Sequence, residues 1–189
     1  MKKSDKRGRL VIISGPSGCG KDTVVNEILR TDKNTRLSIS CTTRRKRDYE
    51  TDGEHYFFLD EREFKDMIAK DGFLEHADYN GKHYGTPSKK VDEQLADGKN
   101  VILVIEVKGA SKVKKKRPDA LMIFLAPPSR EVLIKRLHNR GTETEEQIEQ
   151  RLLIMKKEVA FKKFYDYEVV NFDYKIAAKE ILNIIKKER

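Results

Sequence analysis

The chain has 189 residues with 40 lysines and arginines against 31 aspartates and glutamates, so its formal net charge is +9. Its apolar fraction of 38% excludes outright disorder, and no apolar run approaches the ~20 residues of a membrane span. The two cysteines, Cys19 and Cys41, are too few for a disulfide framework and have no metal-ligand spacing. We therefore expect a soluble, reduced, cytoplasmic protein without a membrane partner, whose positive charge favours an anionic ligand.

The first part of the chain predicts short strands and turns. Leu10–Ser14 is an apolar run without alternation, which is typical of a strand buried on both faces. A glycine-rich turn and a helical pattern follow this run. Residues 38–42 and 55–59 predict further strands, and the pair Asn80-Gly81 predicts a tight hairpin.

Capping residues mark several helix starts. Asp60 and Glu63 have the spacing of a capping box, in which each side chain bonds the other residue's backbone N–H. Thr86-Pro87 predicts a cap and a proline in the first turn of a helix. Ser129 predicts another cap, ahead of an apolar stripe at helical spacing.

The second half of the chain alternates strands with helices. Residues 101–105, 121–125 and Tyr167–Val170 predict strands, and helical patterns separate and follow them. This alternation predicts an α/β fold with a parallel sheet. Residues 38–86 break the rhythm and indicate an inserted, mixed segment.

Residues 15–23 have the pattern of a phosphate-binding loop. They lie between an apolar run and a helical pattern, which is the context that such a loop requires. Glycines let the backbone approach a phosphate, and the loop N–H groups and helix N-terminus attract its negative charge. The expected binding residues for the phosphoryl donor are Gly15, Pro16, Ser17, Gly18, Cys19, Gly20, Lys21, Asp22 and Thr23.

Asp22 departs from the usual motif. A serine or threonine normally follows the lysine and ligates Mg²⁺, whereas here the hydroxyl comes one residue later, at Thr23. Aspartate is a hard oxygen ligand that could bind Mg²⁺ directly or through water, but its charge repels phosphate unless a metal screens it. Our hypothesis is that magnesium binding survives, with Asp22 and Thr23 as candidate ligands.

Glu106 and a set of arginines complete the candidate site. A carboxylate directly after a buried strand reaches the sheet edge where nucleotides and metals bind, although many strands end in a charge by chance. Arginine suits phosphoryl transfer because its planar fork binds phosphate and stays protonated. Each arginine could also be an ordinary surface charge. The candidates are Arg44, Arg45, Arg47, Arg136, Arg140 and Arg151.

With these features in view, the whole chain from about Gly8 onward resembles the guanylate kinase family. Several separate motifs in the right order carry the resemblance, which makes it far more specific than one loop. The matching segments are GPSGCGK (15–21), SCTTRRKR (40–47), GEHYFF (53–58), GFLEHA (72–77), YGT (84–86), FLAPPS (124–129), RLHNRGTETEEQI (136–148) and YDYEVVN (165–171).

The resemblance implies a three-layer P-loop fold with two additions. A parallel-sheet core would comprise residues 8–37, 88–129 and 161–189, within a single domain. Residues 38–87 would form an inserted, mixed α/β lobe that binds GMP, and residues 130–160 a helical lid. The implied reaction passes the γ-phosphoryl group of ATP to GMP, giving ADP and GDP, with Mg²⁺ as cofactor and dGMP as a further acceptor.

The resemblance also implies residue roles. Ser40, Arg44, Arg47, Tyr56 and Tyr84 would hold the GMP phosphate, and Glu75, Thr86 and Glu106 would face the guanine. The groups that would stabilise the transferred charge are Lys21, Arg44, Arg136, Arg140 and Arg151. Two departures stand out: family members usually carry an acid where this chain has Val104, and an aspartate where it has Glu106.

Three other readings remain open at this point. A non-catalytic guanylate-kinase-like module would bind phosphopeptides, but it would not need Lys21 or the lid arginines. A related P-loop kinase would use another acceptor, although Glu75 and Thr86 favour guanine. The basic run at residues 112–117 permits an RNA-binding protein, but it carries no interleaved aromatics, so nucleic acid is a weak expectation. The sequence leaves monomer and homodimer open.

Overall fold

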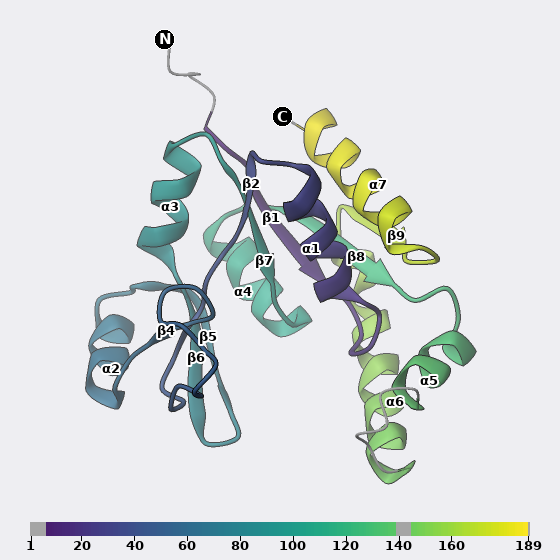
Figure 1. Ribbon diagram of the computed structural model, residues 1–189, viewed down its shortest axis with the longest axis horizontal. Helices are drawn as coiled ribbons and strands as arrows, with labels where there is room; N and C mark the ends of the chain where they lie inside the picture. Colours follow the sequence, from purple (N-terminus) through teal and green to yellow (C-terminus); the bar gives the residue numbers. More distant parts are fainter. Residues whose placement is uncertain (1–6, 139–144, 189) are drawn as a thin grey trace.

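The computed structural model describes residues 7–138 and 145–188 (Figure 1). Its core is a five-stranded sheet in the order β2-β7-β1-β8-β9, and every neighbouring pair is parallel. The α/β fold with a parallel core sheet is thereby confirmed. The core strands are β1 (Leu10–Ser14), β2 (Thr35–Leu37), β7 (Asn100–Val104), β8 (Leu121–Ala126) and β9 (Tyr167–Val170).

Helices cover both faces of this sheet, which explains why its strands are apolar without alternation. Val11 and Ile13 of β1 pack on α1 (Lys21–Thr31) and α7 (Tyr174–Lys187). Leu10 and Ile12, on the opposite face, share a core with apolar residues of α3 (Ser88–Ala96) and α4 (Val107–Lys116). The described helices are all too short or too polar to span a bilayer.

A second, four-stranded sheet lies between β2 and α3 in the chain, in the order β4-β3-β6-β5. Its strands are β3 (Cys41–Thr42), β4 (Phe57–Phe58), β5 (Phe73–Tyr79) and β6 (Lys82–Pro87), and α2 (Glu61–Ala69) accompanies them. Asn80 and Gly81 both have positive φ angles, 53° and 68°, so the predicted hairpin is confirmed. The predicted capping box of Asp60 and Glu63 is also present.

Two helices, α5 (Arg130–His138) and α6 (Glu145–Ala160), follow β8. Leu133 and Leu152 are buried between them. The Ser129 hydroxyl accepts a bond from the Val132 backbone N–H at 3.3 Å, as its predicted capping role requires. Figure 1 shows this helix pair and the second sheet projecting from the same end of the core, to either side of it.

Two local predictions need correction. The strand predicted at residues 38–42 is confirmed only in part: β2 ends at Leu37 in the core sheet, and Cys41–Thr42 alone forms a strand, in the second sheet. Thr86 does not cap α3, whose start has no side-chain cap. Its hydroxyl donates instead to Glu75 Oε1 at 2.9 Å, because the hairpin brings these two residues into register.

The basic run at the end of α4 is largely paired within the fold. Lys114 contacts Asp166 at 3.3 Å, while Lys116 reaches Asp71 at 2.6 Å. Arg117 contacts Asp92 at 2.6 Å. Since much of its charge is balanced by carboxylates, this run offers little support for an RNA-binding surface.

Candidate active site

The loop at residues 15–20 is built by close backbone packing. Gly20, directly before α1, has a φ of 93°, a left-handed conformation that favours glycine. A Cβ on Gly15 would lie 2.1 Å from the Leu125 carbonyl oxygen, so only glycine fits beside β8. Asn171, which follows β9, is buried and donates from Nδ2 to the Cys19 carbonyl at 2.8 Å. The core strands therefore fix the loop at the carboxyl edge of the sheet, where its N–H groups can receive phosphate.

Lys21 lies at the first position of α1 and folds back over this loop. Its Nζ donates to the carbonyl oxygens of Gly15 and Pro16, at 2.6 and 3.0 Å. These carbonyls hold the ammonium group next to the place where the loop would bind phosphates. The charge of Lys21 is thus positioned for an anion that the backbone also attracts.

A pocket of about 570 Å³ separates the second sheet from the start of α4. It gathers five of the predicted substrate residues, although they come from separate parts of the chain. These lining residues are Ser40, Tyr56, Glu75, Tyr84 and Glu106. Thr86 lines a neighbouring pocket of about 180 Å³, and Ser40 and Tyr56 border both pockets.

Glu75 is a half-buried carboxylate that lines the larger pocket. Burial raises the pKa of Glu75 above its usual value, while the bond from Thr86 and the charge of Lys112 oppose this shift. A Cβ on Gly109 of α4 would lie only 3.1 Å from Glu75 Oε2. The helix therefore leaves room for this oxygen at a glycine, and Thr86 orients the other.

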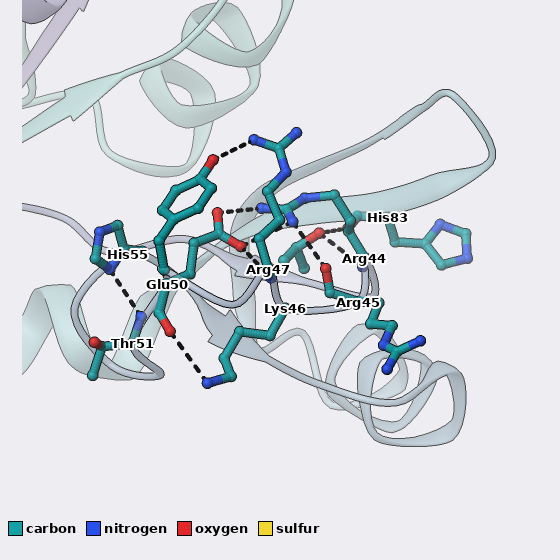
Figure 2. Close-up of polar contacts among 10 residues, drawn as sticks. Arg44, Arg45, Lys46, Arg47, Glu50, Thr51, His55 and His83 are labelled. Atoms are coloured by element: carbon teal, nitrogen blue, oxygen red, sulfur yellow. Dashed lines mark hydrogen bonds and ion pairs between the residues drawn. The ribbon is translucent and has the colours of Figure 1, made fainter.

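Arg44 is held by a carboxylate that the sequence did not single out. Its two terminal nitrogens donate to both oxygens of Glu50, at 3.0 and 2.7 Å, in a bidentate pair (Figure 2). Glu50 is 6% exposed, and its hydrogen bonds to Arg44 lower its pKa to about 2. The guanidinium carbon of Arg44 lies 5.4 Å from the centre of the Tyr56 ring. Glu50 thus fixes the arginine beside a pocket-lining tyrosine.

The same carboxylate organises the rest of the loop. The Arg47 backbone N–H donates to Glu50 Oε2 at 2.8 Å, and Lys46 Nζ donates to the Glu50 backbone carbonyl at 3.2 Å (Figure 2). The rings of Tyr56 and Tyr84 meet edge to face, 6.0 Å apart. Arg44, Tyr56 and Tyr84 therefore lie together, and Arg47 belongs to the same loop.

A second carboxylate that the sequence did not single out, Glu158, lies near the end of α6 (Glu145–Ala160) and is partly buried. Its neighbour Val159 packs against Val107 and Phe124 of the core. Burial raises the pKa of Glu158, the charge of Lys21 lowers it, and Glu106 raises it again. Glu106 also raises the pKa of Glu75, with which it lines the larger pocket.

The predicted lid arginines lie largely outside the described residues. Arg136 belongs to α5 and Arg151 to α6, but their side chains are not described. Arg140 falls wholly in the undescribed segment at residues 139–144. Their predicted role stays a prediction.

Comparison with known proteins identifies the family. The family model described as "Guanylate kinase" matches residues 7–188. The chain belongs to the guanylate kinase family. It is 50% identical to guanylate kinase from Prochlorococcus marinus (strain NATL2A), over 92% of this chain and 94% of that protein. With guanylate kinase from Carboxydothermus hydrogenoformans it shares 46% identity, over 97% of this chain and 90% of that protein.

One solved structure supports the same family, and a second shares the fold. The guanylate kinase of Anaplasma phagocytophilum has a TM-score of 0.74 and 31% identity, covering 97% of this chain and 87% of that one. A shikimate kinase from Bacteroides thetaiotaomicron, at 13% identity and a TM-score of 0.51, covers 94% of this chain and 98% of that one. That second likeness concerns the fold alone.

No motif in the sequence distinguishes Glu50 or Glu158 from the other aspartates and glutamates, of which the chain has 31 in all. Glu50 is recognisable only through the two guanidinium bonds that it accepts. Glu158 is recognisable only in the fold, where burial raises its pKa and the charge of Lys21 lowers it. Both assignments depend on contacts that the linear spacing of charges does not predict.

Proposed function

We propose that the ATP-dependent phosphorylation of GMP to GDP, the reaction of the guanylate kinase family to which this chain belongs, proceeds here by in-line displacement of ADP from the γ-phosphoryl group. One observation supports placing the donor and acceptor sites side by side. The pocket of about 180 Å³ is lined by Asp22, next to the P-loop lysine, and also by Ser40, Tyr56 and Thr86. A donor phosphate on the loop would therefore lie next to the acceptor site. Phosphoryl transfer depends mainly on such positioning and on compensating positive charge.

In this proposal, the acceptor lies between the second sheet and α4. Glu75 accepts hydrogen bonds from guanine N1–H and the exocyclic amine, with Thr86 orienting its other oxygen and Glu106 close by. Ser40, Tyr56 and Tyr84 bind the phosphate together with Arg44 and Arg47. Residues 38–87 act as the GMP lobe on the core formed by 8–37, 88–129 and 161–189.

The donor phosphates lie on the loop at residues 15–20, where Lys21 neutralises their charge. Residues 130–160 act as the lid that excludes water, since an open site would allow ATP to be hydrolysed. Arg136, Arg140 and Arg151 would bring positive charge to the transferred group. We place the reaction in the cytoplasm.

The donor set fits a magnesium ion shared with ATP. Asp22 and Thr23 offer oxygen atoms, the ligands that Mg²⁺ prefers. Within residues 7–138 and 145–188, no group of three or more histidine, cysteine, aspartate or glutamate residues could hold a metal alone. Phosphate oxygens and water would complete the coordination, as is usual for Mg²⁺. When bound, such an ion would offset phosphate charge, and Asp22 and Thr23 would hold it directly or through water.

Replacing Asp22 with asparagine is expected to weaken Mn²⁺ binding to the complex with a non-hydrolysable ATP analogue by about 10-fold or more. Electron paramagnetic resonance measures the free ion, with Mn²⁺ standing in for Mg²⁺. Because Val104 lines the same pocket as Asp22, adding Val104→Asp should restore part of the affinity. Asp119→Asn, at an exposed position, is the control. Equal affinities for Asp22→Asn and the control would contradict the assignment.

An acceptor panel tests the proposed reaction. With ATP and Mg²⁺, ADP formation should be fastest with GMP and slower with dGMP. Turnover with AMP should be lower by ~10⁴ or more, because adenine has no N1–H and no C2 amine for Glu75. UMP and CMP should also fail. No turnover with any acceptor would favour a non-catalytic binding module, and preference for another acceptor would favour a related kinase.

A further inference from the structure

Tyr49 is an exposed aromatic residue in the loop between β3 and β4. Its exposed fraction is 69%, so packing does not explain its presence. Arg47, which contacts Tyr49, and Glu50, the next residue in the chain, both belong to the hydrogen-bond network around Arg44. The sequence motifs assigned Tyr49 no role.

The hydroxyl of Tyr49 is tied to this network by one short bond. Arg47 Nη1 donates to Tyr49 Oη at 2.7 Å, and the Arg47 guanidinium carbon lies 6.0 Å from the centre of the Tyr49 ring. An exposed arginine loses much of its rotamer freedom when it is ordered. Tyrosine has only two side-chain torsions, so it can restrict Arg47 before any ligand arrives.

The direction of this bond decides what the hydroxyl can still do. Arginine carries no acceptor, so the Tyr49 oxygen accepts from Arg47 and the Tyr49 O–H must point elsewhere. Within the part of the chain that the structure describes, no hydrogen bond uses this O–H as donor. The nearby carboxylate of Glu50 already accepts from both terminal nitrogens of Arg44 and from the Arg47 backbone.

We propose that Tyr49 is a further phosphate-binding residue, which orients Arg47 and donates its O–H to an oxygen of the acceptor's phosphate. A phosphate held by Arg47 presents several acceptor oxygens within reach of a group bonded to the same guanidinium. Tyr49 would then add a third tyrosine hydroxyl to those of Tyr56 and Tyr84. This inference rests on the proposed function, because it takes the acceptor phosphate to lie beside Arg44 and Arg47.

The proposal predicts that removing the Tyr49 hydroxyl weakens the binding of a ligand only if that ligand carries the phosphate. Tyr49→Phe keeps the ring and removes the hydroxyl, so the dissociation constant for GMP should rise about 10-fold, the usual effect of a hydrogen bond to a charged group. Guanosine has no phosphate, and its affinity should not change. In steady state, the effect should fall on KM for GMP rather than on kcat. Isothermal titration calorimetry gives the affinities, and a coupled ADP assay gives the kinetics.

Matched variants separate this proposal from its alternatives. Tyr174→Phe, on α7, removes a hydroxyl far from the second sheet and should leave GMP affinity unchanged. Arg47→Ala should weaken GMP binding more than Tyr49→Phe does. Combining the two should weaken binding further than Arg47→Ala alone but by less than the sum of the single effects, since the hydroxyl acts both on the phosphate and through this arginine.

Several results would overturn the role of Tyr49. If Tyr49→Phe binds GMP like the unmodified chain while Arg47→Ala does not, Tyr49 has no phosphate role and the proposed function stands. If GMP and guanosine lose affinity equally, the tyrosine supports the lobe rather than the phosphate. If the unmodified chain does not phosphorylate GMP, the proposed function fails first.

Discussion

Replacing Lys21 with methionine is expected to lower kcat by on the order of 10²–10³-fold, the usual cost of removing one group that stabilises transition-state charge. The reason is geometric. Lys21 Nζ is held by two loop carbonyls beside the place where the loop N–H groups would bind the donor phosphates. Methionine has a similar length but no charge, so the loop can keep its shape while the developing negative charge loses its partner.

The measurement is steady-state ADP formation at saturating ATP and GMP, with thermal unfolding followed in parallel. Lys179→Met, at an exposed position of α7, makes the same chemical change far from the loop and should leave kcat unchanged. Lys21→Met should unfold at nearly the temperature of the unmodified chain. A kcat within about 3-fold of that chain would show that the P-loop lysine does not act on the transferred group.

Replacing Glu75 with glutamine is expected to lower kcat/KM for GMP by on the order of 10²-fold. The carboxylate can accept from both guanine N1–H and the exocyclic amine, whereas an amide presents one oxygen and an NH₂ group that opposes one of these donors. The loss should be smaller for AMP, so the ratio of GMP to AMP turnover should fall. Thr86 would still donate to the remaining oxygen, and the hairpin should stay intact.

Glu54→Gln is the matched control, because Glu54 is an exposed acid of the same region. It should leave the acceptor preference unchanged. The pH dependence gives a second readout. Burial raises the pKa of Glu75, and only the ionised form accepts both guanine donors. The GMP kcat/KM should therefore fall with decreasing pH, beginning at a higher pH than an ordinary glutamate would give, and Glu75→Gln should lack that decline. An unchanged GMP preference in Glu75→Gln would place the guanine elsewhere.

The sequence alone determined the parts of this protein that are local. The P-loop pattern at residues 15–23 depends on consecutive residues, because a strand, glycines and a helix start are enough to form the backbone cradle. The capping box of Asp60 and Glu63 and the hairpin at Asn80-Gly81 are local for the same reason. Buried strands such as β1 were predictable because burial on both faces demands unbroken apolar runs.

Strands that are stabilised mainly by backbone pairing with a neighbouring strand were harder to predict from the sequence. β2 consists of Thr35–Leu37, with one buried and two exposed residues, so it shows neither an apolar run nor clear alternation. It forms a strand because its backbone pairs with β7 at the edge of the core sheet. Residues 38–42 have a more strand-like sequence, yet only Cys41–Thr42 forms a strand.

Only the tertiary structure decided the contacts within the acceptor site. Thr86 had the sequence context of a helix cap, but the register of β5 and β6 turns its hydroxyl toward Glu75. The role of Glu50 is evident only in the fold, where its carboxylate accepts hydrogen bonds from the Arg44 side chain and the Arg47 backbone. A side-chain hydrogen bond depends on distances of about 3 Å between groups that the chain brings together only when it folds, so residue spacing can nominate the partners but cannot choose between them.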